Sequence, residues 1–171
     1  ILSLSTSLIH CPLIPKEKKH MKTDRTAIEK FFSAKAFAVV GVSGNRKKFG
    51  NMAFRAMTDR GMVVYPVNPH RMKVEGVKCY SSVLELPETV TSIVTMIHPA
   101  ATEQMISDCI PKKIDVVWMQ SGSESKNAID EAVANGITVI SGQCIMMFLE
   151  PVVSAHAVHR WFNKIVGAYP R

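Results

Sequence analysis

The sequence predicts a single α/β domain in which helices cover both faces of a doubly wound, mostly parallel sheet. β-branched apolar runs alternate along the chain with segments of helical periodicity. These runs are apolar at consecutive positions, as is typical of strands that are buried on both faces. The chain has 171 residues, 47% of them hydrophobic, which matches one domain of roughly 100–200 residues.

The first third of the chain predicts a helix, a strand and a second helix. Thr23 or Asp24 is expected to cap the first helix. The apolar residues of that helix recur at helical spacing and are Ala27, Ile28, Phe31 and Phe32. A strand over 37–42 and a helix over 50–61 follow. The apolar side of this second helix is expected to comprise Met52, Phe54, Ala56 and Met57.

The rest of the chain continues the alternation and completes a three-layer, Rossmann-like pattern. Further strands are predicted over 62–68, 77–80, 92–98, 115–120 and 137–141. A helical turn at 81–87 and helices opened by Pro99 and by Ser123 connect them. The residues expected to face inward from these two helices are Ala101, Met105, Ile106, Cys109, Ile129, Ala132 and Val133. A final amphipathic helix is expected from about Val152 to Val166.

Residues 1–20 differ from the rest of the chain. They are mildly apolar, then basic, and lack the features of a secretory signal. We expect them to be an extension that is not native, with Met21 as the start of a Rossmann-like domain over 21–171. The alternative is an arm that docks on a neighbouring molecule.

Composition and charge limit the classes of function. No apolar run approaches the roughly 18 residues that span a bilayer, so no membrane segment is predicted. The four cysteines lie far apart without metal-ligand spacing, which indicates a reducing, cytoplasmic setting and no metal site.

Residues 26–75 hold nine basic and three acidic side chains. This excess favours an anionic partner or, equally, a basic solvated surface. No aromatic platform accompanies the cations, so we expect no nucleic-acid partner.

Ligands of doubly wound sheets bind at the carboxyl ends of the strands, where the strand order reverses. The residues at these ends are rich in Gly, Pro, Ser, Asn and Gln. They are Gly41, Val42, Ser43, Gly44 and Asn45; Asn68, Pro69, His70 and Arg71; Ile97, His98 and Pro99; Met119, Gln120, Ser121 and Gly122; Gly142, Gln143 and Cys144.

The turn after the first strand carries the strongest chemical signal. Gly41 and Gly44 permit close approach of the backbone, and the amides of residues 43–46 precede a helix start that favours a phosphate. The adjoining cations are Arg46, Lys47 and Lys48. The competing interpretation is a tight turn with a solvated basic edge.

The departure from the dinucleotide pattern G-x-G-x-x-G narrows the choice of ligand. Ser43 and Arg46 stand where that pattern needs glycine. The second strand ends without the carboxylate that grips the ribose of NAD, and Arg71 and Lys73 follow instead. These cations favour a ligand with a phosphorylated ribose, which is coenzyme A with its 3′-phosphate or NADP, and they argue against plain NAD.

The chain resembles the stand-alone coenzyme A-binding domains, which are similar to the N-terminal domain of the succinyl-CoA synthetase alpha subunit. The resemblance spans about Phe37 to Glu150 and rests on AVVGVSGN, VYPVNP, GVKCYSSVLELPE, VVWMQSG and GQC. It implies a phosphate loop over 43–46 and a ligand contact at Arg71. It also implies that 97–99 borders the adenine and that 119–121 lines the other side of the cleft.

Residues with catalytic chemistry do not form a recognisable constellation. The carboxylates Asp115, Asp130, Glu131 and Glu150 make no acid–base pair, and no nucleophile elbow occurs. Cys144 is interpreted as a semi-buried residue beside the cleft, although it is placed to approach the thiol of coenzyme A.

We therefore expect a binding domain for coenzyme A or an acyl-CoA rather than an enzyme. The first alternative is an NADP-linked oxidoreductase. The second is an interaction module with a vestigial cleft that forms a homodimer through the final helix, with Trp161 and Phe162.

Overall fold

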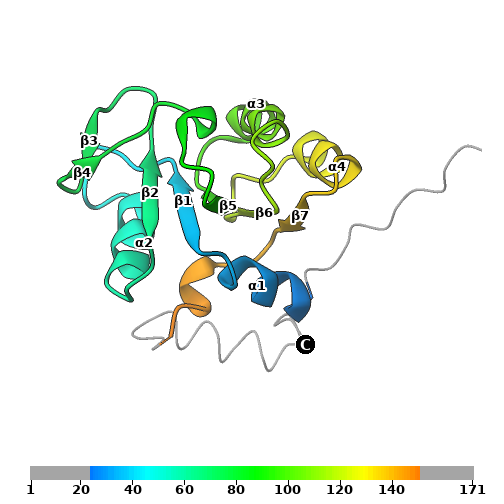
Figure 1. Cartoon of the computed structure of the whole chain (residues 1–171), viewed down its shortest axis with the longest axis horizontal. Coiled ribbons are helices and arrows are strands. Elements are labelled where there is room, and N and C mark those ends of the chain that lie inside the picture. Colours follow the sequence, from blue (N-terminus) through cyan, green and yellow to red (C-terminus); the bar gives the residue numbers. More distant parts are fainter. Residues whose placement is uncertain (1–23, 151–171) are drawn as a thin grey trace, which may run out of the picture.

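The computed structural model describes residues 24–150, and its elements alternate as predicted (Figure 1). The helices are α1 (Arg25–Phe32), α2 (Phe49–Thr58), α3 (Pro99–Cys109) and α4 (Lys126–Ala134), with 3-10 turns η1 (Val83–Glu85) and η2 (Ile145–Met147). The strands are β1 (Ala36–Val40), β2 (Val64–Val67), β3 (Lys73–Val74), β4 (Val77–Lys78), β5 (Val90–Thr95), β6 (Val116–Met119) and β7 (Thr138–Ile140). The predicted extension 1–20 and the predicted final helix lie outside the described residues.

Five strands form one parallel sheet in the order β2-β1-β5-β6-β7. From β1 the chain first moves outward to β2 and then returns to β5 on the other side. The strand order therefore reverses between β1 and β5, and the carboxyl ends of these two strands mark the switch point. The prediction of a doubly wound parallel sheet is confirmed.

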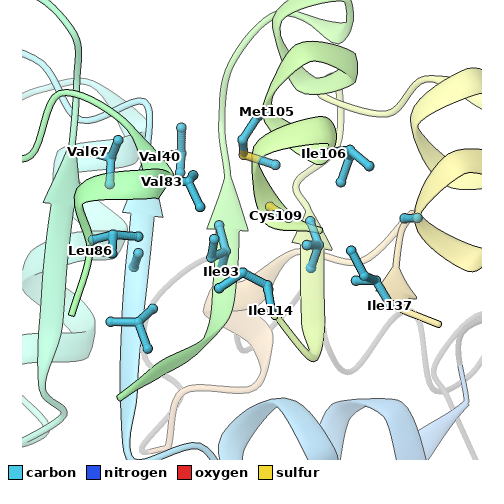
Figure 2. Packing of buried hydrophobic residues seen from close by; sticks show 14 of the residues in the cluster. Val40, Val67, Val83, Leu86, Ile93, Met105, Ile106, Cys109, Ile114 and Ile137 are labelled. Atoms are coloured by element: carbon cyan, nitrogen blue, oxygen red, sulfur yellow. The ribbon is translucent and has the colours of Figure 1, made fainter. Parts of the chain in front are cut away.

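Helices cover both faces of the sheet (Figure 1). Helices α1 and α2 share one core with β1 and β6, in which Trp118 is fully buried against the ring of Phe31. Helices α3 and α4 pack on the other face, where Met105, Ile106 and Cys109 meet the central strand β5 (Figure 2). The two cores fix the sheet from both sides, so the strand ends form a rigid platform.

Two helices bury a slightly different face from the one expected. In α3, Thr102 is buried with Met105, Ile106 and Cys109, whereas Ala101 is exposed. In α2, the buried residues recur at helical spacing and are Gly50, Asn51, Ala53, Phe54 and Met57. Met52 is 38% exposed because it falls between these positions, about 100° away along the helix. The expectations for Ala101 and Met52 are wrong. Ile129 and Val133 are half-buried at the edge of the core, beside the fully buried Ala132.

An antiparallel hairpin of β3 and β4 lies beyond the edge strand β2 (Figure 1). Only the second of these strands is predicted from the sequence. The hairpin turns at Glu75 and Gly76, both with positive φ, of 51° and 83° respectively. Its return leads into Tyr80, which bridges to Val67 at the end of β2.

Candidate functional site

The β1–α2 loop (residues 41–48) begins at a glycine that no other residue can replace without strain. Gly41 has a φ of +103°, and a Cβ placed there would lie 2.6 Å from the carbonyl oxygen of Met96. The end of β1 therefore passes directly against the segment that leaves β5. This contact places the loop at the switch point of the sheet.

A second glycine brings the start of α2 against the same turn. A Cβ on Gly50 would lie 2.5 Å from the carbonyl oxygen of Gly41. Because Gly50 has no side chain, the first turn of α2 can approach the end of β1 closely. Gly50 is not among the site residues predicted from the sequence. Its place at the second position of the helix, shortly after a glycine turn, is the signal that identifies it.

Asn51 holds the loop from inside the protein. Its side chain is fully buried, its Oδ1 accepts a hydrogen bond from the Ser43 amide at 2.9 Å, and its Nδ2 donates to the Ser43 carbonyl at 2.8 Å. Further along, the Ser43 hydroxyl accepts from the Asn45 amide at 3.1 Å, and Asn45 Oδ1 accepts from the Lys47 amide at 2.9 Å. The loop conformation is thus fixed by its own polar groups.

These bonds determine which amides remain for a ligand. Those of Ser43 and Asn45 are engaged within the protein. Among the described residues, four amides around the helix start donate to no protein group, namely Gly44, Arg46, Phe49 and Gly50. Unpaired amides at a helix N-terminus attract anions through their partial positive charge.

The turn after β2 delivers a cation to this loop. Asn68 Nδ2 donates to the Val42 carbonyl at 2.5 Å, and Asn68 Oδ1 accepts from the His70 amide at 2.8 Å. The turn through the exposed Pro69 brings the guanidinium of Arg71 over Gly44, where a Cβ would meet its Cζ at 3.0 Å. Two predicted site segments that are far apart in sequence therefore meet.

The remaining cations of the loop differ in their partners. Arg46 forms an ion pair with Glu75 at 3.1 Å, although its own side chain is 74% exposed. Lys47 and Lys48 are exposed, and within residues 24–150 neither forms a salt bridge. Glu75 is the carboxylate that sequence reasoning missed, because it reaches the site from the hairpin and not from the end of β2.

A cavity of about 530 Å³ adjoins the loop at the ends of β5 and β6. Its lining comprises Phe49, Met96, Ile97, His98, Gln120, Ser121, Gly122 and Ser123. Five predicted site residues are among these: Ile97, His98, Gln120, Ser121 and Gly122. We call this the strand-end cavity. Its walls are part apolar and part hydroxyl or amide, as is common in sites for extended small molecules.

Other predicted site residues lie around the cavity without lining it. Pro99 begins α3, and His98 caps that helix, its Nδ1 accepting from the Ala100 amide at 3.4 Å. Met119 is fully buried in the core, and so is Val42, which meets the site only through its backbone. Cys144 is half-buried, next to Ile145, whose amide donates to Gln120 Oε1 at 3.2 Å.

No helix within residues 24–150 is long and apolar enough to cross a lipid bilayer.

The sheet order, the loop at the switch point and the adjoining cavity define a Rossmann-like α/β domain with a cavity at the carboxyl edge of its sheet. Residues 35–150 match the family described as CoA binding domain. The chain belongs to this family, and the predicted resemblance is confirmed.

Relatives of the chain are of two kinds. It is 30% identical over 129 residues to the alpha subunit of ADP-forming acetate–CoA ligase II from Pyrococcus furiosus, covering 69% of this chain and 28% of that subunit. It is 32% identical over 130 residues to the uncharacterized protein YneT from Bacillus subtilis, covering 73% and 87% of the two chains. The chain thus spans less than a third of the ligase subunit and most of the small protein.

Solved structures show the same fold. A hypothetical protein from Pyrococcus horikoshii OT3 superimposes with a TM-score of 0.72 at 28% identity, covering 81% of this chain and 99% of that one. A conserved hypothetical protein from Pyrococcus furiosus gives a TM-score of 0.64 at 34% identity, covering 67% and 98%. The Rossmann-like assignment is confirmed by these neighbours.

Proposed function

We propose that the chain binds coenzyme A or an acyl-CoA at the carboxyl edge of its sheet and performs no chemistry on it. Membership of the CoA-binding family supports the ligand class. The observation that carries the proposal is the guanidinium of Arg71, held beside Gly44 in a loop with unpaired amides.

In this proposal the diphosphate lies on the amides of Gly44 and Arg46 and at the start of α2. There the helix dipole and the unpaired N–H groups favour negative charge. Ser43 and Asn45 shape the loop but donate their amides elsewhere. The amides assigned to the diphosphate therefore differ from the four of residues 43–46 that were expected from the sequence.

The 3′-phosphate of the ribose is assigned to Arg71, with Lys47 and Lys48 as further cations. Arg71 is exposed and forms no salt bridge within the described residues, so its charge is available to a ligand. Arg46 contributes less, because Glu75 already neutralises it. A guanidinium binds phosphate through several donors, which favours a phosphorylated ribose over a plain one.

Pantetheine would extend from the loop into the strand-end cavity and run toward Gln120. The hydroxyl and amide groups at Gln120, Ser121 and Ser123 suit the amide-rich pantetheine chain. The acyl group, where one is present, would lie at the far end of this path.

Calorimetric titration of the full chain with coenzyme A, acetyl-CoA, NAD and NADP tests the proposal. We expect coenzyme A or acetyl-CoA to bind at least about tenfold more tightly than NADP, and NAD to bind more weakly still. Tighter binding of NADP would support the oxidoreductase alternative. Binding of none of the four, together with a dimer in analytical ultracentrifugation, would support the interaction module.

A further inference from the structure

Glu75 occupies an unusual position at the tip of the β3–β4 hairpin. Its φ is +51° and that of Gly76 is +83°, a succession that two-residue hairpins usually fill with Asn-Gly or Asp-Gly. Its side chain is nevertheless only 4% exposed. A non-glycine residue in the left-handed region persists where its surroundings hold it, and such residues gather at functional sites.

The carboxylate of Glu75 joins three parts of the molecule. Oε1 accepts from Arg55 Nη1 at 2.7 Å and from Asn51 Nδ2 at 3.0 Å, both on α2. Oε2 lies 3.1 Å from Nη2 of Arg46 in the β1–α2 loop. Arg55 also donates to the Arg46 carbonyl at 3.1 Å. The hairpin tip is therefore tied to the helix and to the loop at once.

The hydrogen bond between Asn51 and Glu75 couples Glu75 to the backbone of the loop, because Asn51 also binds the Ser43 amide. An ionised carboxylate only accepts hydrogen bonds, so it must face the Nδ2 end of the Asn51 amide. The Oδ1 end then turns to the amide of Ser43, at 2.9 Å. Hydrogen bonding from Asn51 lowers the pKa of Glu75, and the charges of Arg55 and Arg46 lower it further, against the effect of burial. The Glu75 carboxylate, which orients Asn51, therefore stays ionised at neutral pH.

We propose that Glu75 is a positioning residue for the anion site: acting through Asn51, Arg55 and Arg46, it fixes the β1–α2 loop before the ligand arrives. This rests on the proposed function, since the loop is taken as the diphosphate site. A preorganised loop binds more tightly because less ordering remains to be done on binding.

Positioning and simple electrostatics make opposite predictions for this residue. Glu75 is negative, so by charge alone its neutralisation would strengthen the binding of an anion. If Glu75 acts by holding Asn51 and the two arginines, Glu75→Gln loosens the loop and weakens binding. The oxygen that pairs with Arg46 becomes an amide that repels the guanidinium, and the bonds from Asn51 and Arg55 to the remaining oxygen lose their charge assistance. Glu75→Gln separates the two, because it removes the charge and keeps the size of the side chain.

The experiment measures amide hydrogen exchange of the ligand-free full chain and its affinity for coenzyme A, in the wild type and in Glu75→Gln. We expect the Ser43 amide to exchange on the order of tenfold faster in the variant, with the Ile93 amide of β5 unchanged. We expect coenzyme A to bind on the order of tenfold more weakly. The matched control is Glu88→Gln, which removes an exposed carboxylate paired with Lys112 at 2.6 Å; both readouts should stay within about twofold.

Unchanged or tighter binding of coenzyme A by Glu75→Gln would overturn the proposal. Weaker binding of coenzyme A together with an unchanged exchange rate of the Ser43 amide would also overturn it, since the loss of affinity would then not arise from the loop. If wild type binds no coenzyme A while Ser43 still exchanges faster in the variant, the proposed function fails and the positioning of the loop stands. Should Glu75→Gln not fold, Glu75→Asn replaces it, because asparagine suits this turn.

Discussion

The β1–α2 loop and the turn after β6 both use a glycine with positive φ, but they are held in different ways. At Gly41, with φ +103°, a Cβ would meet the Met96 carbonyl at 2.6 Å; at Gly122, with φ +92°, it would meet nothing within 4 Å. The first loop is clamped by the fully buried Asn51. The second is tied by Glu124, which accepts from the amides of Gly122 at 2.6 Å and Gly142 at 3.2 Å.

The difference separates a fixed part of the site from an adaptable one. Around Gly41, packing and a buried polar network determine the backbone together, so one geometry is strongly preferred. Around Gly122 there is space, and the turn is restrained by the half-buried carboxylate of Glu124 and by the Ser123 amide, which donates to the Gln120 carbonyl at 2.8 Å. Under the proposed function, the first loop meets the diphosphate, which every acyl-CoA shares, and the second faces the part of the ligand that varies.

Replacing each of the two glycines with alanine should give the largest effect, and it tests whether the two turns are restrained differently. Gly41→Ala should lower the free energy of unfolding by about 3–4 kcal/mol, because the methyl group meets a carbonyl and the backbone is strained. Gly122→Ala should cost only about 1–2 kcal/mol, from backbone strain alone. Urea denaturation measures both. Equal losses would show that the two turns are restrained alike.

The polar restraints allow a second comparison. Asn51→Leu removes the buried partner of Ser43 and should lower the free energy of unfolding by about 2–3 kcal/mol, because both Ser43 backbone groups lose their hydrogen bonds. Glu124→Gln keeps an acceptor for only one of the two amides, because Gly122 and Gly142 donate to different oxygens of Glu124, so we expect a loss of about 1 kcal/mol. A larger loss at Glu124 than at Asn51 would reverse the assignment of the rigid loop.

The smallest expected effect is a pH dependence of the stability, which arises from Glu75 beside the β1–α2 loop. Asn51, Arg55 and Arg46 lower the pKa of Glu75 from its ordinary value of 4.5. A lowered pKa in the folded chain gives stability that is complete above pH 4.5 and is lost as the pH falls through the folded value. Glu75→Gln should therefore be less stable than wild type at pH 7, and the gap should shrink as the pH falls below 4.5. Urea denaturation across this range measures the gap, and a constant gap would contradict the shift.

The sequence predicted the sheet well because its signals are local. The consecutive apolar residues of β1, β5 and β6 reflect burial on both faces, and Pro99 marks the start of α3. Met52 and Ala101 were wrongly expected to be buried, because the buried faces of α2 and α3 are rotated slightly around the helix axes from the expected ones. Strand β3 has two residues, Lys73 and Val74, which is too short for any periodic pattern.

The site was predicted only where its residues lie at strand ends. Arg71 could be assigned to the loop because parallel strands end at one edge. Asn51 and Glu75 could not, because they lie 24 positions apart in the chain and their contact depends on how the hairpin folds back onto α2. A buried network of this kind leaves no periodic signal in the sequence.

The most direct test of the account is a calorimetric titration of wild type and Arg71→Glu with coenzyme A and dephospho-coenzyme A. Lys35→Glu, an exposed charge reversal just before the amino end of β1, serves as the control. We predict that Arg71→Glu weakens coenzyme A by at least about thirtyfold and dephospho-coenzyme A by less than about threefold. Equal losses for the two ligands would contradict the assignment of Arg71 to the ribose phosphate.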